Sequence, residues 1–195
     1  MDKKRALVIN ASPRGKGHIS QLLEMAKEDL RAKGFSVTEF VVATSVYRHC
    51  TGCMACRTRR ECVLPADDAQ RFVGLMRDSD ILVIGTPCYW GNMPGQLKGL
   101  FDRMVYAMMD DNTSLWPRPL MKGKRVAVIA TSTTPWPWNR LFGQTSGAVC
   151  AIKEIMKYSG IRLVGTLQKG NTHRRHGITP ADTRKLHRLM ARLAR

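Results

Sequence analysis

Residues 6–20 read Ala6-Leu7-Val8-Ile9-Asn10-Ala11-Ser12-Pro13-Arg14-Gly15-Lys16-Gly17-His18-Ile19-Ser20. The first four residues are apolar and predict a buried strand. The apolar residues that come after this stretch recur at three- and four-residue intervals, which predicts a helix. The loop between them is small, hydroxylated and basic, and it ends at a helix N-terminus, where backbone N–H groups and the helix dipole favour an anion. The dinucleotide fingerprint and the Walker nucleotide loop are both absent, so a monophosphate fits better. An ordinary turn with Ser20 as N-cap is the alternative.

The same strand-then-helix pattern continues along the chain of 195 residues. Further apolar, β-branched runs predict strands at residues 37–42, 81–84, 126–129 and 161–167, and apolar residues between them recur at helical spacing. Gly34 and Gly160 stop the first and the last of the intervening helices. The alternation predicts an α/β fold with a doubly wound parallel sheet and helices on both faces, in one domain over residues 1–195.

A basic C-terminal helix is predicted at about residues 180–195. Pro180 opens it, and one face carries Leu186, Leu189, Met190 and Leu193 with Lys and Arg opposite. A solvated helix face is the simplest interpretation of these charges.

Two more loops follow predicted strands, at the edge of the sheet where such folds bind ligands. The first reads Gly85-Thr86-Pro87-Cys88-Tyr89-Trp90-Gly91-Asn92-Met93-Pro94-Gly95, and the second combines hydroxyls and rings over residues 131–138. Adjacent Tyr and Trp suit a loop that covers something flat, although packing under a loop or at a dimer interface is an alternative.

Together, the first two loops resemble the NAD(P)H-dependent FMN reductases of the flavodoxin-like superfamily over roughly residues 5–168. The resemblance implies a three-layer sandwich with strand order 2-1-3-4-5. It also implies an FMN site formed by Ser12, Arg14, His18, Ile19, Ser20, Pro87, Cys88, Tyr89, Trp90, Gly91, Asn92, Thr131, Ser132 and Thr133. The family usually has Gly at Ala11 and Asn-Thr at His18-Ile19, which affects phosphate contacts rather than the fold.

Four of the six cysteines, Cys50, Cys53, Cys56 and Cys62, lie in a predicted cysteine-rich loop at residues 46–68. This stretch resembles the iron-sulfur flavoproteins of the same superfamily, and the spacing fits one local [4Fe-4S] cluster. Structural zinc fits less well, because zinc sites usually pair two knuckles across a longer insertion. Inheritance of the motif without a cluster stays open, because similar cluster-free flavin reductases carry it.

The formal net charge is +17, which suits anionic cofactors, acidic proteins or nucleic acid without choosing among them. Nucleic acid is the alternative from another class, but the aromatic residues are not interleaved with the basic ones, which argues against it. No apolar run reaches the length of a signal-peptide core or a membrane span, so we expect a cytoplasmic protein that does not associate with a membrane.

The resemblance therefore implies an enzyme that passes electrons from NAD(P)H through FMN to an acceptor, which is a small molecule or a ferredoxin-like carrier. It assigns no catalytic side chain. A cluster-free flavin or quinone reductase and a non-catalytic electron carrier are alternatives, and family resemblance also implies a homodimer or homotetramer.

Overall fold

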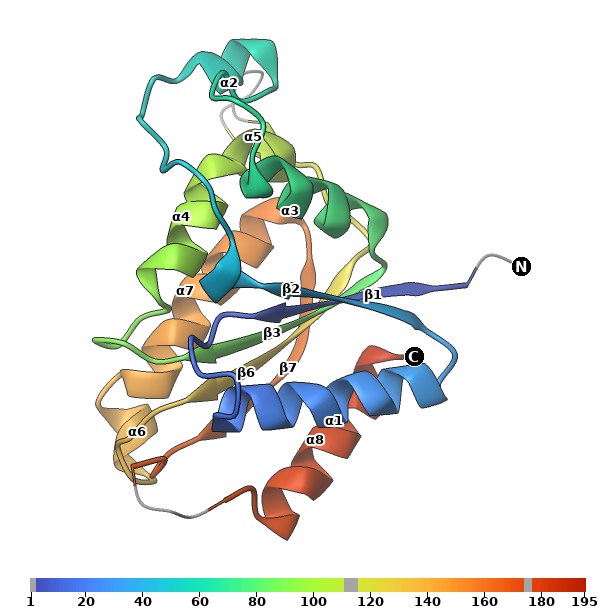
Figure 1. Ribbon diagram of the computed structural model, residues 1–195, viewed down its shortest axis with the longest axis vertical. Helices are drawn as coiled ribbons and strands as arrows, with labels where there is room; N and C mark the ends of the chain where they lie inside the picture. The colour runs from blue at the N-terminus through green and yellow to red at the C-terminus, as the bar shows by residue number, and fades with distance from the viewer. Residues whose placement is uncertain (1–2, 111–115, 174–176) are drawn as a thin grey trace.

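A twisted parallel sheet forms the middle layer of the molecule (Figure 1). The computed structural model describes residues 3–110, 116–173 and 177–195. Five strands make the sheet in the order β2-β1-β3-β6-β7: β1 (Arg5–Asn10), β2 (Ser36–Val41), β3 (Ile81–Pro87), β6 (Arg125–Thr131) and β7 (Arg162–Lys169). This arrangement is the predicted 2-1-3-4-5 order. The labels differ because β4 (Met109–Asp110) and β5 (Arg118–Pro119) form a separate antiparallel pair that the sequence did not suggest.

Helices cover both faces of the sheet, as predicted (Figure 1). One face carries α1 (His18–Ala32) and α8 (Pro180–Leu193); the other carries α3 (Asp68–Asp78), α4 (Gly95–Arg103), α5 (Val105–Met108) and α7 (Gln144–Ser159). Three short elements complete the described chain: η1 (Val42–Thr44), α2 (Ala55–Arg59) and α6 (Trp138–Leu141). Successive residues of the central strands enter opposite cores, with Leu7 and Ile9 on the α3 side and Ala6 and Val8 on the α1 side.

Most predicted helix ends are confirmed. Gly34 and Gly160 have φ of +86° and +78° at the ends of α1 and α7, a conformation that glycine adopts without steric cost. Asp67 caps α3 in a reciprocal capping box with Gln70. The N-cap role of Ser20 was wrong, because α1 begins two residues earlier, at His18.

The C-terminal helix is amphipathic as predicted. Leu186, Leu189, Met190 and Leu193 are buried against the sheet and α1. Among the described residues, none of the helices combines the length and apolarity needed to cross a membrane.

Candidate functional site

The loop after β1 turns sharply and delivers the chain into α1. Ser12 N–H donates to Asn10 Oδ1 (3.1 Å), and Arg14 N–H donates to Ser12 Oγ (3.2 Å). Ser20 Oγ then donates to the Arg14 carbonyl (2.9 Å) from the first turn of α1. Both buried hydroxyls therefore shape the loop itself, which is the structural reason that Ser20 lies inside the helix rather than capping it.

The N-terminus of α1 has no side-chain cap. Gly17 occupies the N-cap position without a hydrogen-bonding side chain, and the first turn contains no acidic residue. Ile19 is buried against Gly85, so only its backbone N–H is available to a ligand. Arg14, in contrast, is exposed beside this helix end. The arrangement suits an anion held chiefly by backbone groups.

The loop after β3 is a tight hairpin turn that presents a tryptophan. Tyr89 and Asn92 exchange two backbone hydrogen bonds (2.9 and 3.0 Å), and both residues between them have positive φ: +53° at Trp90 and +72° at Gly91. Such turns normally select Gly or Asn at these positions. A bulky, fully exposed tryptophan (102%) in left-handed backbone is therefore a strained arrangement of the kind found at ligand sites.

Backbone hydrogen bonds join the three loops into one site. Ala11 N–H donates to the Gly85 carbonyl (2.9 Å), and Cys88 N–H donates to the Thr131 carbonyl (2.7 Å). The loops after β1, β3 and β6 therefore meet at adjacent carboxyl ends of the sheet, at the left of Figure 1. All fourteen predicted FMN residues lie in these loops or in the strand end and first helical turn that border them.

The loop after β6 is held by hydrogen bonds to β7 and to the segment that follows β7. Ser132 N–H donates to the Lys169 carbonyl (3.0 Å), and the Ser132 carbonyl accepts from both the N–H and the hydroxyl of Thr172 (3.1 and 2.9 Å). Thr131 and Ser132 are buried, whereas Thr133 is exposed. Only the last of the three predicted residues thus presents its side chain to solvent.

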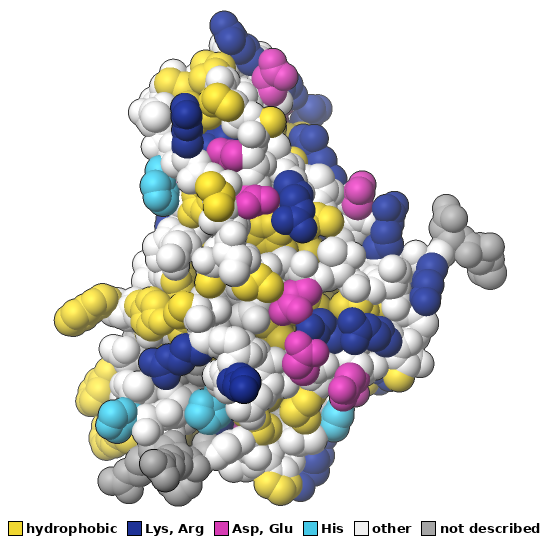
Figure 2. All heavy atoms as spheres, viewed as in Figure 1, with side chains coloured by type: hydrophobic (Ala, Val, Ile, Leu, Met, Phe, Trp, Pro, Cys, Tyr) yellow, Lys and Arg dark blue, Asp and Glu magenta, His cyan; other side chains and the backbone are white. Residues whose placement is uncertain are grey.

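Exposed apolar side chains gather around these loops. Figure 2 shows hydrophobic side chains along the left edge of the molecule, over the loop after β3 and around α6. The exposed members are Tyr89, Trp90, Trp136, Trp138, Leu141 and Phe142, and the Trp138 and Phe142 rings stack at a centroid distance of 5.2 Å. We call these six residues the apolar rim.

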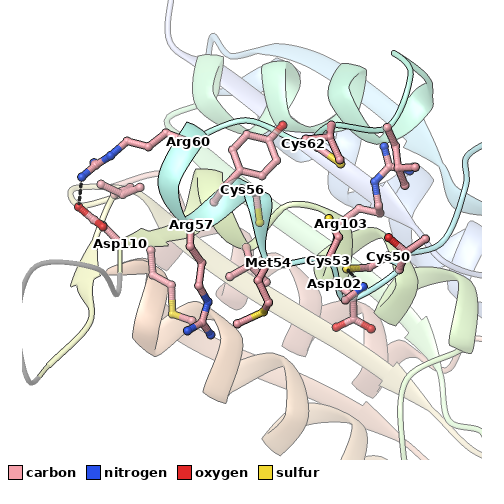
Figure 3. A pocket seen from close by; sticks show the side chains of 18 residues that line it. Cys50, Cys53, Met54, Cys56, Arg57, Arg60, Cys62, Asp102, Arg103 and Asp110 are labelled. Carbon is pink, nitrogen blue, oxygen red and sulfur yellow. Dashed lines mark hydrogen bonds and ion pairs between the residues drawn. The ribbon is translucent and has the colours of Figure 1, made fainter.

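The cysteine-rich segment lies elsewhere, over α4 and α5 at the top of Figure 1. Cys50, Cys53, Cys56 and Cys62 all line one cavity of about 150 Å³, which is walled mainly by apolar side chains (Figure 3). Burial, followed by the charges of the other three thiols, raises the pKa of Cys56. Hydrogen bonds from the Ala55 N–H and the Thr51 hydroxyl lower the pKa of Cys53.

A buried arginine anchors this segment to α4. Arg103 donates to the Arg48 carbonyl and to Asp67 Oδ2 (3.0 Å), and its side chain is fully buried. Burial raises the pKa of the Asp67 carboxyl, but hydrogen bonds from two backbone N–H groups and the guanidinium outweigh burial, so this pKa lies below its ordinary value. The pairing of Asp67 with a residue 36 positions away is visible only in the fold.

The four thiols do not form a finished metal site. Within residues 3–110, 116–173 and 177–195, no group of three or more His, Cys, Asp or Glu side chains is placed to hold a metal ion. The shared cavity thus brings the predicted ligands to one place without bringing them into coordination geometry.

Comparison with known proteins agrees with the loop geometry. The family model described as NADPH-dependent FMN reductase matches residues 5–140, which contain all three loops at least as far as α6. The chain belongs to this family. Members of the FMN reductase family thus share with this chain the segment that places the three loops.

Two curated relatives of this FMN reductase family member carry names that describe different kinds of flavoprotein. An iron-sulfur flavoprotein of Archaeoglobus fulgidus is 32% identical over 120 residues, which are 62% of this chain and 50% of the relative. An FMN-dependent NAD(P)H:quinone oxidoreductase of Pseudomonas aeruginosa is 32% identical over 151 residues, covering 66% of this chain and 68% of the relative. The chain thus spans about half the length of the first relative.

A solved structure of an FMN-dependent NADH-azoreductase from Bacillus anthracis, in complex with FMN, matches 98% of this chain and 100% of its own with a TM-score of 0.76. The sequences are 15% identical, so this likeness shows the flavodoxin-like fold alone.

Two positioning residues of this FMN reductase family member were missed from the sequence. Asn10 bonds Ser12 N–H through Oδ1 and Ser20 Oγ through Nδ2, and a polar residue directly after an apolar strand was the available signal. Gly147 in α7 leaves room for the Gly91 carbonyl, a contact between distant segments with no local signal.

Proposed function

We propose that this protein binds FMN across the loops after β1, β3 and β6 and passes electrons from NAD(P)H to an acceptor. The observation that carries the proposal is the junction of these loops beside the uncapped N-terminus of α1. Bound FMN supplies hydride acceptance and electron donation. The chain's own residues hold and orient it.

Each loop has a distinct part in the proposed site. The first turn of α1 holds the phosphate through backbone N–H groups, and exposed Arg14 adds a compensating charge. The hairpin turn at Trp90 and Gly91 fixes one border of the ring site, and Thr131 to Thr133 form the other. The Cys88 N–H is already bonded to the Thr131 carbonyl, so these two borders are held at a fixed separation.

The phosphate position can be tested with a pair of variants that differ only in charge. Gly17→Asp and Gly17→Asn both introduce side chains that cap helices well at extended backbone, but only the carboxylate repels a phosphate. We expect Gly17→Asp to bind FMN about tenfold more weakly than Gly17→Asn, measured by quenching of flavin fluorescence.

Riboflavin, which lacks the phosphate, provides the control. Its affinity should be the same for the two variants. Equal FMN affinities for Gly17→Asp and Gly17→Asn would show that the phosphate does not bind at this helix end. Absence of NAD(P)H oxidation by the FMN-loaded wild type, with quinones as acceptors, would remove the enzymatic part of the proposal.

A [4Fe-4S] cluster in the cysteine-rich segment is a second candidate, favoured by the four thiols around one cavity. The side chains must still move into coordination positions, so no step of the proposed electron transfer is assigned to a cluster. The cavity borders the C-terminal end of α4, whereas the loop after β3 leads into the N-terminal end. The nine residues of α4 separate these two ends by about 13 Å.

Anaerobic loading with iron and sulfide tests this candidate. Cys56→Ser should abolish iron binding, while Cys150→Ser, which changes an exposed thiol outside the segment, should retain it. Loss of iron from both variants, or from neither, would contradict a cluster at this place.

Self-association completes the proposal. The apolar rim is unusually exposed for a monomer, and we propose that a second copy covers part of it in a homodimer or homotetramer. Light scattering should give a mass above 21.9 kDa, and Phe142→Glu should return it toward that value.

A further inference from the structure

A groove runs between the edge strand β7 and α8, and its lining includes Arg140 of α6. Two adjoining hollows of about 320 and 440 Å³ form it, and Arg192 lines both. The β7 residues from Leu163 to Gln168 contribute to its lining. We call it the basic groove, because seven of its lining side chains are Lys or Arg and none is Asp or Glu.

The cations of the basic groove are arranged in two rows. Lys185, Arg188, Arg192 and Arg195 form the row on and just beyond α8. The second row consists of Arg125 on β6, Arg162 on β7 and Arg140 on α6. Lys185, Arg188 and Arg192 are spaced by three and four residues, which places them on one face of α8 over about 10 Å, and Arg195 follows just beyond the helix end.

These seven cations have no ionic partner among the described residues. The structure pairs buried Lys169 with Asp182 at 2.7 Å, yet it gives no carboxylate to any member of the two rows. Six of the seven are exposed, and Arg125 is half-buried. Their charge is therefore available to a ligand.

The placement of these charges opposes folding rather than helping it. Arg125 and Arg162 are direct neighbours in the register of β6 and β7, and the α8 row repeats like charges one turn apart. Like charges at such positions destabilise sheets and helices by a few tenths of a kcal/mol each. A bound polyanion would turn this repulsion into attraction.

The lining favours one class of polyanion. Membrane insertion needs an apolar helix face, but the apolar face of α8 is buried in the core. Protein interfaces have cores depleted of charge and enriched in aromatic residues, whereas this lining has no aromatic side chain. Protein–nucleic acid interfaces are more polar and far more positively charged.

We propose that the basic groove binds the phosphate backbone of nucleic acid without reading its sequence. The separation of aromatic from basic residues, which argued against nucleic acid from the sequence, leaves no ring in this groove for base stacking but does not exclude backbone binding. A bulge that leaves Val164 out of register on β7 also makes this edge a poor template for an added peptide strand. The proposal is independent of FMN binding.

Salt-dependent binding to a duplex DNA of arbitrary sequence tests the groove, with fluorescence anisotropy as the readout. The variant pair is Arg188→Gln with Arg192→Gln. The control pair is Lys4→Gln with Lys33→Gln, which removes the same charge from exposed positions at the opposite side of the sheet. Removing two phosphate contacts should lower the slope of log K against log salt by about 1.8 and weaken binding about tenfold.

The control pair should leave both quantities nearly unchanged. Equal losses in the two pairs would show that the overall charge of +17, not the groove, attracts the DNA. Tighter binding of polyglutamate than of the duplex at the same salt would assign the groove to an acidic polypeptide and overturn the proposal. Thermal melting and FMN affinity, expected to be unchanged in both pairs, show that the variants fold.

Discussion

At the scale of single residues, two glycines in helices have opposite surroundings. A Cβ at Gly147 would overlap the carbonyl oxygen of Gly91, so α7 and the β3 loop pack backbone to backbone. A Cβ at Gly74 in α3 would meet nothing within 4 Å. The first glycine is required by a contact, whereas the second only lowers helix propensity.

Alanine at these two positions should therefore change stability in opposite directions. We expect Gly147→Ala to destabilise the protein by about 1–3 kcal/mol and to weaken FMN binding, because the β3 loop must move. Gly74→Ala should stabilise it by about 0.5–1 kcal/mol and leave FMN binding unchanged. Urea denaturation and flavin titration measure both effects, and a stabilised Gly147→Ala would contradict the described contact.

The buried Arg103 gives a second prediction at this scale. Arg103→Met should destabilise the protein by about 3–5 kcal/mol, because it leaves the Asp67 carboxylate and the Arg48 carbonyl without their buried donor. Arg71→Met is the matched control: it breaks an exposed pair with Asp68 and should change stability by no more than about 1 kcal/mol.

Local loosening should accompany the loss of Arg103. Hydrogen exchange ought to accelerate in the segment that begins at Arg48 well before it does in the sheet. Uniform acceleration across the sheet would mean that Arg103 supports the whole fold rather than this segment.

At the scale of elements, the sequence predicted what periodicity and capping chemistry encode. The five long strands, the ends of α1 and α7 at Gly34 and Gly160, and the apolar face of α8 were all predicted from local patterns. The strands β4 and β5 have two residues each, too short to show a period. The N-cap of α1 was misplaced because the Ser20 hydroxyl bonds the Arg14 carbonyl, and only the folded loop reveals that contact.

The candidate FMN site likewise combines features encoded in local sequence with contacts that only the fold reveals. The order of strands placed the three loops together, so the residues predicted to bind FMN could be grouped from the sequence. The contact of Gly147 with Gly91 and the basic groove join segments far apart in the chain, and single-sequence patterns carry no information about such pairs.

The docking of α8 should depend on pH through Asp182. Burial raises the pKa of this carboxyl, but hydrogen bonds from Lys169 and Thr179 outweigh burial, so the pKa in the folded state is lowered. The stabilisation is therefore complete above the ordinary carboxyl pKa of about 3.9 and is lost as pH falls through the lower folded value.

Asp182→Asn isolates this contribution. At pH 7 the variant should be less stable than the wild type by about 1–3 kcal/mol, because Lys169 loses a charged partner while the cap is largely kept. The difference should shrink below about pH 4, as judged by urea denaturation across a pH series. A stability difference that grows as the pH falls would contradict the lowered pKa of Asp182 in the folded state.

At the scale of the whole molecule, FMN should stabilise the folded chain by binding only to it. At a free concentration a hundred times Kd, the gain is about 2.7 kcal/mol, which for this size corresponds to a Tm increase of roughly 5–10 °C. Scanning calorimetry with FMN and with riboflavin measures it. A tenfold loss of affinity lowers this gain to about 1.4 kcal/mol, so the FMN shift of Gly17→Asp should be about half that of Gly17→Asn; equal shifts would contradict the proposed phosphate position.

The exposure of the tryptophan side chains also determines what intrinsic fluorescence can report. All four tryptophans are exposed, by 49% to 102%, and three of them lie in the apolar rim. In the unassociated chain these indoles are already exposed to water, so their emission wavelength should change little on unfolding and intrinsic fluorescence will report its denaturation poorly. The same indoles beside the flavin loops are placed to lose emission by energy transfer when a yellow chromophore arrives, so a dim, unshifted spectrum would be the signature of a loaded protein.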